Sequence, residues 1–163
     1  MMSRRNTLLG LGALSAVLAG ARGLLTGSSA HAARTYEITR TDAEWKKMLN
    51  ADQYKVLRKA GTETPYTSPL NKEKRAGVYS CAGCAQPLVS SATKYERGTG
   101  WPSFWQAMDK AVAEESDTSL FMKRIEALCS RCGGHLGHVF DDGPKPTGLR
   151  YCMNGVAMNF KAA

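Results

Sequence analysis

Four of the five cysteines in this 163-residue chain form two Cys-x-x-Cys pairs, and this spacing strongly limits how the chain can fold. Cys81 pairs with Cys84 and Cys129 with Cys132, and 44 residues separate the pairs. Two such turns supply the four thiolates of a closed tetrahedral zinc site, with bonds of about 2.3 Å. A redox dithiol and a pair of structural disulfides are the alternatives. Because neither pair has the strand–helix context of a redox motif, we predict one structural Zn²⁺ per chain.

The fifth cysteine, Cys152, is the only thiol that such a zinc site leaves free. Arg150 precedes it by two residues and Asn154 follows it by two, so the three side chains share one face of a regular strand. A nearby cation lowers the pKa of a thiol, and the amide offers a hydrogen-bond donor beside the sulfur. The alternative is an inert, buried thiol that packs as a small hydrophobic residue. We interpret Cys152 as a candidate nucleophile.

The N-terminus has the three parts of a secretory signal peptide. Arg4 and Arg5 precede an apolar run over residues 8–21, and the small-residue sequence Ala30-His31-Ala32 follows. The run of 14 residues is shorter than the roughly 20 that span a bilayer, although an uncleaved anchor remains the alternative. The paired arginines indicate the twin-arginine route. We predict a signal peptide over residues 1–32, periplasmic (extracytoplasmic) location, and no stable membrane association after cleavage.

The remaining residues, 33–163, are long enough for one domain with a hydrophobic core. Three of the 22 basic residues lie in the first 32, which contain no acidic residue, so this domain carries a formal net charge of +5. Its basic residues do not form the dense stripe that is typical of nucleic-acid-binding proteins. We therefore expect no nucleic-acid partner.

Local patterns predict two helices followed by a mainly β domain. Thr41 and Glu44 have the spacing of a capping box, and Asn50 is placed to cap a second helix that stops at Gly61. After this point, short apolar runs alternate with turn residues, which indicates antiparallel strands. The clearest of these strands are expected at residues 77–80, 120–122 and 156–160.

Two histidines and one tryptophan are further candidates for a site. His135 and His138 are the only histidines in the predicted domain. On a regular strand they face opposite ways, and Gly137 between them is a candidate for a bulge that turns both side chains inward. Spacing alone leaves at least one of them in doubt. Trp101 lies among glycines, which suits an indole exposed in a pocket as well as one packed in the core.

At these residues the chain resembles the methionine-R-sulfoxide reductases of the B class. The resemblance covers most of the predicted domain, from about Thr41 to Phe160. It rests on both cysteine pairs and on the runs at residues 100–104, 135–140, 143–144 and 146–154. It implies a fold of two packed antiparallel sheets with short N-terminal helices. It also implies the R epimer of methionine sulfoxide, mainly within proteins, as the substrate.

The resemblance assigns roles to individual residues of this chain. Cys152 attacks the sulfoxide sulfur and becomes a sulfenic acid. The side chains of His138, His135 and Asn154 bind or protonate the departing oxygen. The residues assigned to substrate binding are Trp101, Phe140 and Arg150.

One position departs from a branch of this family. Many members carry a resolving cysteine where this chain has Thr99, and the four paired cysteines are committed to zinc. We therefore expect a monomeric enzyme whose sulfenic acid is reduced by an external thiol or a thioredoxin-like reductant. A zinc-ribbon module for nucleic acid and a non-catalytic zinc-clamped scaffold are the rival functions.

Overall fold

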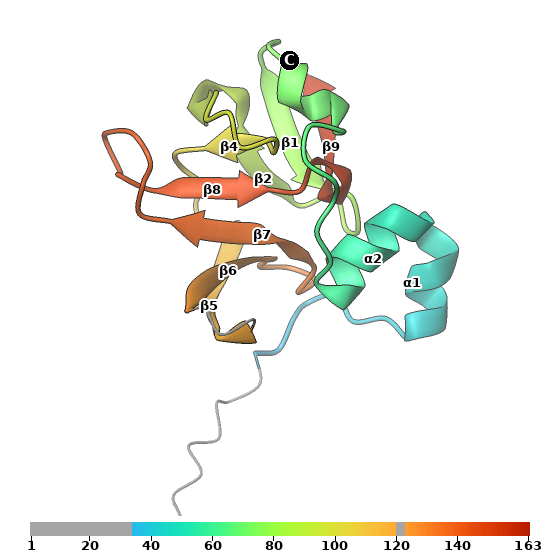
Figure 1. The fold of residues 1–163 in the computed structure, drawn as a ribbon. Coiled ribbons are helices and arrows are strands. Elements are labelled where there is room, and N and C mark those ends of the chain that lie inside the picture. Colours follow the sequence, from blue (N-terminus) through green and yellow to red (C-terminus); the bar gives the residue numbers. More distant parts are fainter. Residues whose placement is uncertain (1–33, 120–122) are drawn as a thin grey trace, which may run out of the picture. The chain divides into compact units, whose positions relative to one another are not determined.

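The computed structural model describes residues 34–119 and 123–163. Two short helices come first, followed by antiparallel strands (Figure 1). The helices are α1 (Asp42–Met48) and α2 (Ala51–Lys59). Both begin at capping boxes, because the side chains of Thr41 and Asn50 accept backbone N–H groups three residues later. The capping prediction is confirmed. Helix α2 ends at Lys59, and the left-handed residue that follows it is Ala60, with φ of 49°, rather than the expected Gly61.

The strands of the described residues form two antiparallel sheets, which confirms the predicted fold class. The order in one sheet is β2-β1-β9, and in the other it is β3-β4-β8-β7-β6-β5. The strands are β1 (Gly77–Cys81), β2 (Pro87–Ser90), β3 (Lys94–Tyr95), β4 (Ser103–Phe104), β5 (Val112–Asp117), β6 (Arg124–Cys129), β7 (His135–Phe140), β8 (Arg150–Met153) and β9 (Met158–Ala162). Short 3-10 helices connect some of them: η1 (Pro69–Lys72), η2 (Ser91–Thr93) and η4 (Gly155–Ala157).

Of the three strands predicted most clearly from the sequence, two lie within the described residues. The strand at residues 77–80 is present as β1. The strand predicted at residues 156–160 is partly wrong, because its first two residues belong to η4 and the strand starts only at Met158. The N–H group of Val156 donates to the side chain of Glu63 rather than to a neighbouring strand. The strand predicted at residues 120–122 and the signal peptide predicted over residues 1–32 lie outside the described residues.

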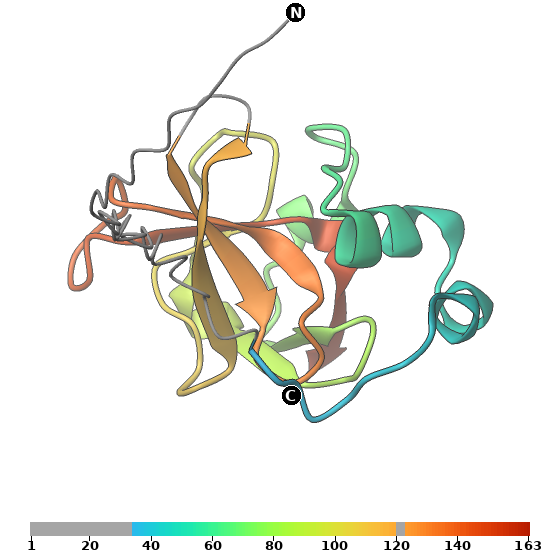
Figure 2. The same ribbon diagram turned by 90° about the horizontal axis from the view of Figure 1, so that it is seen from below.

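Aromatic side chains pack the two sheets together. The ring of Tyr79 in β1 contacts that of Phe104 in β4 edge-on, with 5.0 Å between the ring centroids. Both side chains are fully buried, and burial of a side chain of this size stabilises a fold by about 1.5–3 kcal/mol. Helix α2 covers β7 and η4, and Figure 2 shows both helices to one side of the sheets. Among the described helices, none is long and apolar enough to cross a membrane.

Candidate functional site

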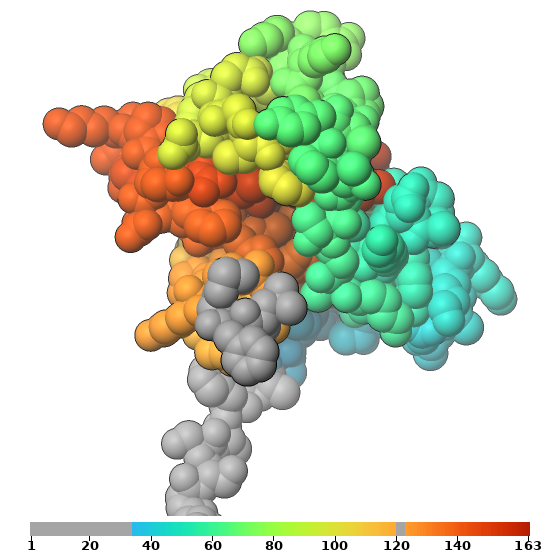
Figure 3. Space-filling model, in the orientation of Figure 1, coloured from blue at the N-terminus to red at the C-terminus, as the bar shows by residue number. Residues whose placement is uncertain are grey.

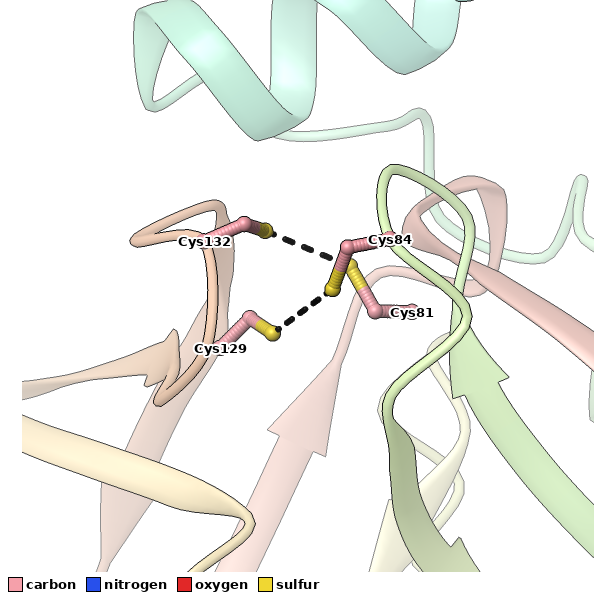
Figure 4. Close-up of side chains that lie close together, drawn as sticks. All are labelled: Cys81, Cys84, Cys129 and Cys132. Atoms are coloured by element: carbon pink, nitrogen blue, oxygen red, sulfur yellow. Dashed lines mark hydrogen bonds between the residues drawn. The ribbon is translucent and has the colours of Figure 1, made fainter. Parts of the chain in front are cut away.

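Two turns, one from each sheet, bring four cysteine sulfur atoms together (Figure 4). The turn between β1 and β2 carries Cys81 and Cys84, and the turn between β6 and β7 carries Cys129 and Cys132. All four Sγ atoms lie within 4.8 Å of one another. The Sγ atoms of Cys81 and Cys132 are 3.8 Å apart, and those of Cys84 and Cys129 are 3.5 Å apart. A disulfide needs about 2.05 Å, so these cysteines are free thiols, as they would be in a metal site.

The four-cysteine cluster has the size of a tetrahedral zinc site. Bonds of about 2.3 Å from a central metal to four sulfurs require sulfur–sulfur separations of about 3.8 Å. The two sulfur–sulfur distances that cross between the turns, 3.8 and 3.5 Å, agree with this geometry. The four cysteines are therefore placed to hold one metal ion, and that part of the sequence prediction is confirmed. The identity of the metal stays a prediction.

The two turns share one backbone pattern. In each, the residue after the second cysteine has a positive φ, 59° at Ala85 and 66° at Gly133. The N–H of that residue donates to the carbonyl of the first cysteine, over 2.8 Å to Cys81 and 2.9 Å to Cys129. Each chain segment is thereby bent so that both of its sulfurs point to one side. At Gly133 a Cβ would lie 2.5 Å from the ring of Tyr36, so this position also needs the missing side chain.

The N-terminal helices support the second turn. Nη1 of Arg58 in α2 donates to the carbonyl of Cys132 over 3.1 Å. The guanidinium of Arg58 also lies over the ring of Trp45, 4.8 Å from its centroid. Leu57 packs against Gly134, where a Cβ would lie only 2.9 Å from a methyl carbon of the leucine. The helices and the four-cysteine cluster therefore form one packed unit.

Cys152 lies in a separate cavity of about 180 Å³. Five of the seven residues predicted for catalysis and substrate binding line this cavity: Trp101, His138, Phe140, Cys152 and Asn154. The other lining residues are Thr62, Arg124, Gly137 and Met153. His135 and Arg150 lie behind its walls. A larger hollow of about 690 Å³ between α2, η1 and β9 is lined by no cysteine or histidine, so the smaller cavity is the candidate active site.

A bulge in β7 brings the two histidines to one side of the strand. The pairing of β6 with β7 shifts register between Ala127, opposite Gly137, and Leu128, opposite His135. Gly137 has φ of 156°, and a Cβ there would lie 2.0 Å from the carbonyl oxygen of Cys152. Only glycine allows β7 and β8 to approach so closely. The bulge expected at Gly137 is present, and the rings of His135 and His138 lie 5.4 Å apart.

His138 is held by a carboxylate that the sequence analysis did not single out. Its Nε2 donates to Oδ2 of Asp117 over 2.9 Å, and Arg124 donates to the same oxygen over 2.6 Å. Burial lowers the pKa of His138, the hydrogen bond to Asp117 opposes this effect, and the positive charge of Arg124 adds to it. The pKa of Asp117 is itself held well below its usual range, first by hydrogen bonds from Ser119 and then by the bond from His138.

His135 is buried beside His138 and has one clear partner. Its Nδ1 donates to Oε1 of Glu126 over 2.6 Å. Its Nε2 is buried and has no hydrogen-bond partner among the residues that the structure describes. His135 therefore contributes a fixed ring behind His138 and does not itself line the cavity.

The thiol of Cys152 has opposing influences on its ionisation. Burial raises its pKa, whereas the positive charge of Arg150 and the nearby polar side chain of Thr99 lower it. Burial is the largest of these effects, so the pKa is raised overall. The sequence analysis expected a pKa lowered by Arg150. The arginine does lower the pKa of the thiol, but the burial of the thiol raises it by more.

Arg150 is fixed beneath the cavity by two contacts. Its Nε and Nη2 donate to the two carboxylate oxygens of Asp142 over 2.7 and 3.1 Å. Its guanidinium lies over the ring of Phe140, 4.1 Å from the centroid. Arg150 therefore contacts Phe140, which lines the cavity, but does not line the cavity itself.

Asn154 and Trp101, on two walls of the cavity, are both bound to Glu63. Nδ2 of Asn154 donates to the carbonyl of Leu136 over 3.0 Å, and its Oδ1 accepts the N–H of Glu63 over 2.9 Å. One N–H of the Asn154 amide remains for a ligand. Nε1 of Trp101 donates to the carbonyl of Glu63 over 3.1 Å, which fixes the plane of the indole.

Comparisons with known proteins agree with the site. A family model described as the SelR domain matches residues 49–162. Three relatives carry the name peptide methionine sulfoxide reductase MsrB. The one from Methanosarcina barkeri is 56% identical over 76% of this chain and 88% of that protein. Those from Leptospira interrogans and Methanosarcina mazei are each 53% identical, over 77% and 76% of this chain and over 97% and 89% of the respective relative. Among solved structures, the Mis18 'Yippee-like' domain aligns at a TM-score of 0.44 and 16% identity, over 55% of this chain and 98% of that chain, a likeness too low for any inference.

The family match covers α2 and every described strand. It includes the four-cysteine cluster, the bulge at Gly137 and the cavity that holds Cys152. The resemblance to the B-class methionine-R-sulfoxide reductases is thereby confirmed. The chain belongs to the SelR-domain family, whose relatives above carry the name peptide methionine sulfoxide reductase MsrB.

Proposed function

We propose that this protein reduces the R epimer of methionine sulfoxide, mainly within proteins, to methionine, and that Cys152 is its nucleophile. The observation that carries the proposal is the cavity itself. It joins the one thiol outside the metal cluster to an imidazole, an amide and an indole. The names of relatives that are more than half identical to this chain support the same reaction.

In the proposed chemistry, oxygen passes from the substrate sulfur to Cys152. The thiolate attacks the sulfoxide sulfur and forms a sulfur–sulfur bond while the sulfoxide oxygen accepts a proton. That bond and the original sulfur–oxygen bond then break as the oxygen, with its proton, bonds to the sulfur of Cys152. The net products are methionine and the sulfenic acid of Cys152, so the substrate gains the two electrons that the thiol loses. Since burial raises the pKa of Cys152, the cation of Arg150 serves to keep enough thiolate available at neutral pH.

The departing oxygen needs hydrogen-bond donors on the cavity wall. His138 and Asn154 both line the cavity. Because Nε2 of His138 is bound to Asp117, the proton that His138 offers to a substrate is the one on Nδ1. One donor at a developing negative oxygen contributes about 3–4 kcal/mol to transition-state stabilisation. In this proposal His135 orients His138 rather than touching the substrate.

Trp101 supplies the surface that distinguishes the epimers. Its indole is held by the bond from Nε1 to Glu63, so a flat apolar wall stands at a fixed angle to the thiol. The sulfur of a sulfoxide is pyramidal. An R epimer whose methyl group contacts the ring therefore directs its oxygen to His138 and Asn154, whereas an S epimer directs it away. Phe140 forms a further apolar part of the same cavity.

Regeneration of the thiol needs an external reductant. Thr99, the residue beside Cys152 where many family members have a resolving cysteine, cannot form a disulfide. One external thiol condenses with the sulfenic acid to give a mixed disulfide and water, and a second thiol releases Cys152 and leaves with the first as a disulfide. We propose a small thiol or a thioredoxin-like protein as this donor.

The metal that we assign to the four-cysteine cluster is Zn²⁺ in a structural role. Four thiolates in a tetrahedral arrangement suit Zn²⁺, and no open coordination position remains for a substrate. The cluster draws one turn from each sheet, so a bound metal joins the sheets without taking part in the reaction.

We also propose that the protein works outside the cytoplasm, because residues 1–32 have the composition of an export signal. Fractionation of cells that express the full chain with a C-terminal tag tests this. The tagged protein is expected in the extracytoplasmic fraction, shortened by about 32 residues. Retention of the full-length chain in the membrane fraction would support an anchor instead.

Turnover of the separate epimers tests the proposed reaction. The metal-loaded protein is supplied with dithiothreitol and with the R or the S epimer of an N-acetylated methionine sulfoxide, beside the variant Cys152→Ser. We expect turnover of the R epimer alone and its loss in the variant, while metal content and thermal unfolding stay unchanged. A folded wild-type protein that reduces neither epimer would contradict the proposal and favour the non-catalytic zinc-clamped scaffold.

Mass spectrometry after one equivalent of the R epimer tests the recycling step. The wild-type protein is expected to carry one added oxygen on Cys152, or an adduct of one small thiol when such a thiol is present. In the variant Thr99→Cys, the introduced thiol is expected to form an intramolecular disulfide with Cys152. A disulfide between Cys152 and any of the four cluster cysteines of the wild-type protein would contradict the proposal.

A further inference from the structure

We infer that Glu63 is a positioning residue that holds two walls of the Cys152 cavity in the arrangement needed for epimer selection. The inference rests on the proposed function. Glu63 lies in the segment between α2 and η1, next to Thr62 but far in sequence from Trp101 and Asn154, and it does not itself line the cavity. Its effect must therefore act through the residues that it binds.

The carboxylate of Glu63 caps the turn that follows Cys152. Its Oε1 accepts the N–H of Gly155 over 2.6 Å, and its Oε2 accepts the N–H of Val156 over 2.9 Å. These are the first N–H groups of η4, which have no partner within the helix. Asn154 is at the N-cap position but makes no side-chain cap. Glu63 supplies the acceptors that an N-cap side chain ordinarily provides.

The backbone of Glu63 completes a reciprocal arrangement with Asn154. The N–H of Glu63 donates to Oδ1 of Asn154 over 2.9 Å, across 91 residues of sequence. The amide of Asn154, which lines the cavity, is thereby held with Oδ1 toward Glu63 and Nδ2 toward the carbonyl of Leu136. Without this bond, Oδ1 and Nδ2 could exchange places, and an acceptor would then face the sulfoxide oxygen.

The carbonyl of Glu63 binds the second wall. It accepts the indole N–H of Trp101 over 3.1 Å. The preceding residue, Thr62, lines the cavity directly. Three residues after Glu63, the N–H of Tyr66 donates to the carbonyl of Gly100 over 2.7 Å, next to Trp101. In the space-filling view, the green segment after α2 runs beside the yellow stretch near residue 100 (Figure 3).

Close packing leaves the Glu63 carboxylate little freedom. A Cβ at Gly155 would lie 1.9 Å from Oγ of Ser68, so the turn can approach Ser68 this closely only because position 155 is glycine, and it would lie in contact with Oε1 of Glu63 at 3.4 Å. Glu63 also lines the larger hollow of about 690 Å³. The side chain of Glu63 therefore lies between the larger hollow and the Cys152 cavity. The turn to which it is hydrogen-bonded, at Gly155 and Val156, separates it from Cys152.

The variant Glu63→Gln tests the inference in the full-length, metal-loaded protein. Glutamine has the same shape but only one side-chain acceptor, so one backbone N–H of η4 faces an amide N–H instead. We expect kcat/KM for the R epimer to fall by between about 10- and 100-fold, as small displacements of positioned groups do. We also expect the preference for R over S to narrow. The rate at which iodoacetamide alkylates Cys152 is expected to stay within about twofold, because the Arg150–Asp142 pair that tunes the thiol lies elsewhere.

The matched control is Glu96→Gln, which removes an exposed carboxylate that pairs with Lys74 and lies outside the cavity. It is expected to retain wild-type turnover and epimer preference. If Glu63→Gln loses its metal or its cooperative unfolding, Glu63→Asp takes its place. Aspartate keeps both acceptors but is one methylene shorter, and a smaller loss of the same kind is expected.

The outcomes separate the inference from the function on which it rests. A wild-type protein without turnover contradicts the proposed function, and the role of Glu63 with it. An active wild-type protein with a Glu63 variant of equal kcat/KM and equal epimer preference overturns the inference alone. A variant in which turnover and Cys152 alkylation fall together, by the same factor, also overturns it, because that result indicates general disruption of the site.

Discussion

The four-cysteine cluster and the Cys152 cavity both depend on cysteine sulfur atoms, but they use them in opposite ways. In the cluster, each sulfur lies within 4.8 Å of three others, and backbone turns aim all four at one point. Cys152 has no second thiol beside it. Its surroundings are an arginine, a threonine and the polar groups of a cavity open to a ligand. The first arrangement places every sulfur to hold one metal ion, and the second leaves one sulfur accessible for reaction.

The comparison shows how differently the two sites are encoded. The cluster depends on short turns that repeat one backbone pattern at Ala85 and Gly133. The cavity depends on contacts between distant segments, such as those that Glu63 makes with Asn154 and Trp101. We therefore expect substitutions in the cluster to affect the whole fold, whereas substitutions around Cys152 affect the reaction and leave the fold largely intact.

The largest expected effect is that of Cys132→Ser, which removes one ligand from the cluster. We expect loss of the metal and of cooperative thermal unfolding, with destabilisation by at least about 3 kcal/mol, since metal binding supplies folding free energy. Metal release into a colorimetric chelator and circular dichroism measure the two effects. Cys152→Ser is the matched control and is expected to keep both metal and stability. Equal unfolding temperatures for the two variants would break the distinction between the sites.

Arg150→Met is expected to slow the chemistry of Cys152 without releasing the metal. Loss of the cation removes a contribution that lowers the thiol pKa, so the pKa rises further. Less thiolate is then present at neutral pH, and each unit of pKa slows alkylation by iodoacetamide about tenfold at pH 7. At a pH above both pKa values the two rates converge. The exposed Arg75→Gln is the control, and an unchanged alkylation profile in Arg150→Met would show that the arginine does not tune the thiol.

Asp117→Asn is expected to have the smallest of these effects. Asp117 raises the pKa of His138 against the effect of burial, so its neutralisation lowers that pKa further. Where protonated His138 assists the reaction, turnover falls as pH rises through this pKa, and the variant shifts that decline to lower pH. At neutral pH we expect a loss of a few-fold, up to about tenfold per unit of pKa. Nuclear magnetic resonance titration of the imidazole measures the shift directly.

The control for this experiment lies on the same strand. Glu115→Gln removes a carboxylate of β5 that pairs with Arg34 rather than with a histidine. It is expected to leave the pH profile of turnover unchanged. A profile in Asp117→Asn that moves to higher pH, or does not move, would mean that His138 does not donate the proton in the proposed reaction.

The sequence predicted features that depend on neighbours in the chain. These features are the capping box at Thr41, the helix cap at Asn50, the bulge at Gly137 and the convergence of two cysteine pairs, and all follow from patterns of a few residues. Antiparallel sheets with N-terminal helices followed from the short alternating runs and from the family resemblance. These features are encoded locally, so they are visible without a structure.

The features that were missed depend on contacts between distant segments. Asp117 reaches His138 across 21 residues, and Glu63 reaches Asn154 across 91. Neither carboxylate stands in a recognisable spacing with its partner, because sheet register and loop path bring them together. The same reason explains the strand wrongly predicted from Val156, whose N–H is taken by Glu63. The raised pKa of Cys152 was also missed, because the alternation of side chains along a strand does not indicate how deeply a side chain is buried.

The place of β8 between β4 and β7 sets an order of events for the proposed reaction. A strand with hydrogen-bonded neighbours on both sides cannot swing out to meet a second partner. The cavity of about 180 Å³ has room for one substrate side chain over the sulfur. Methionine must therefore depart before any reductant can reach the oxidised sulfur. Such a site works by double displacement, so plots of reciprocal rate against reciprocal substrate concentration at several reductant concentrations are parallel lines.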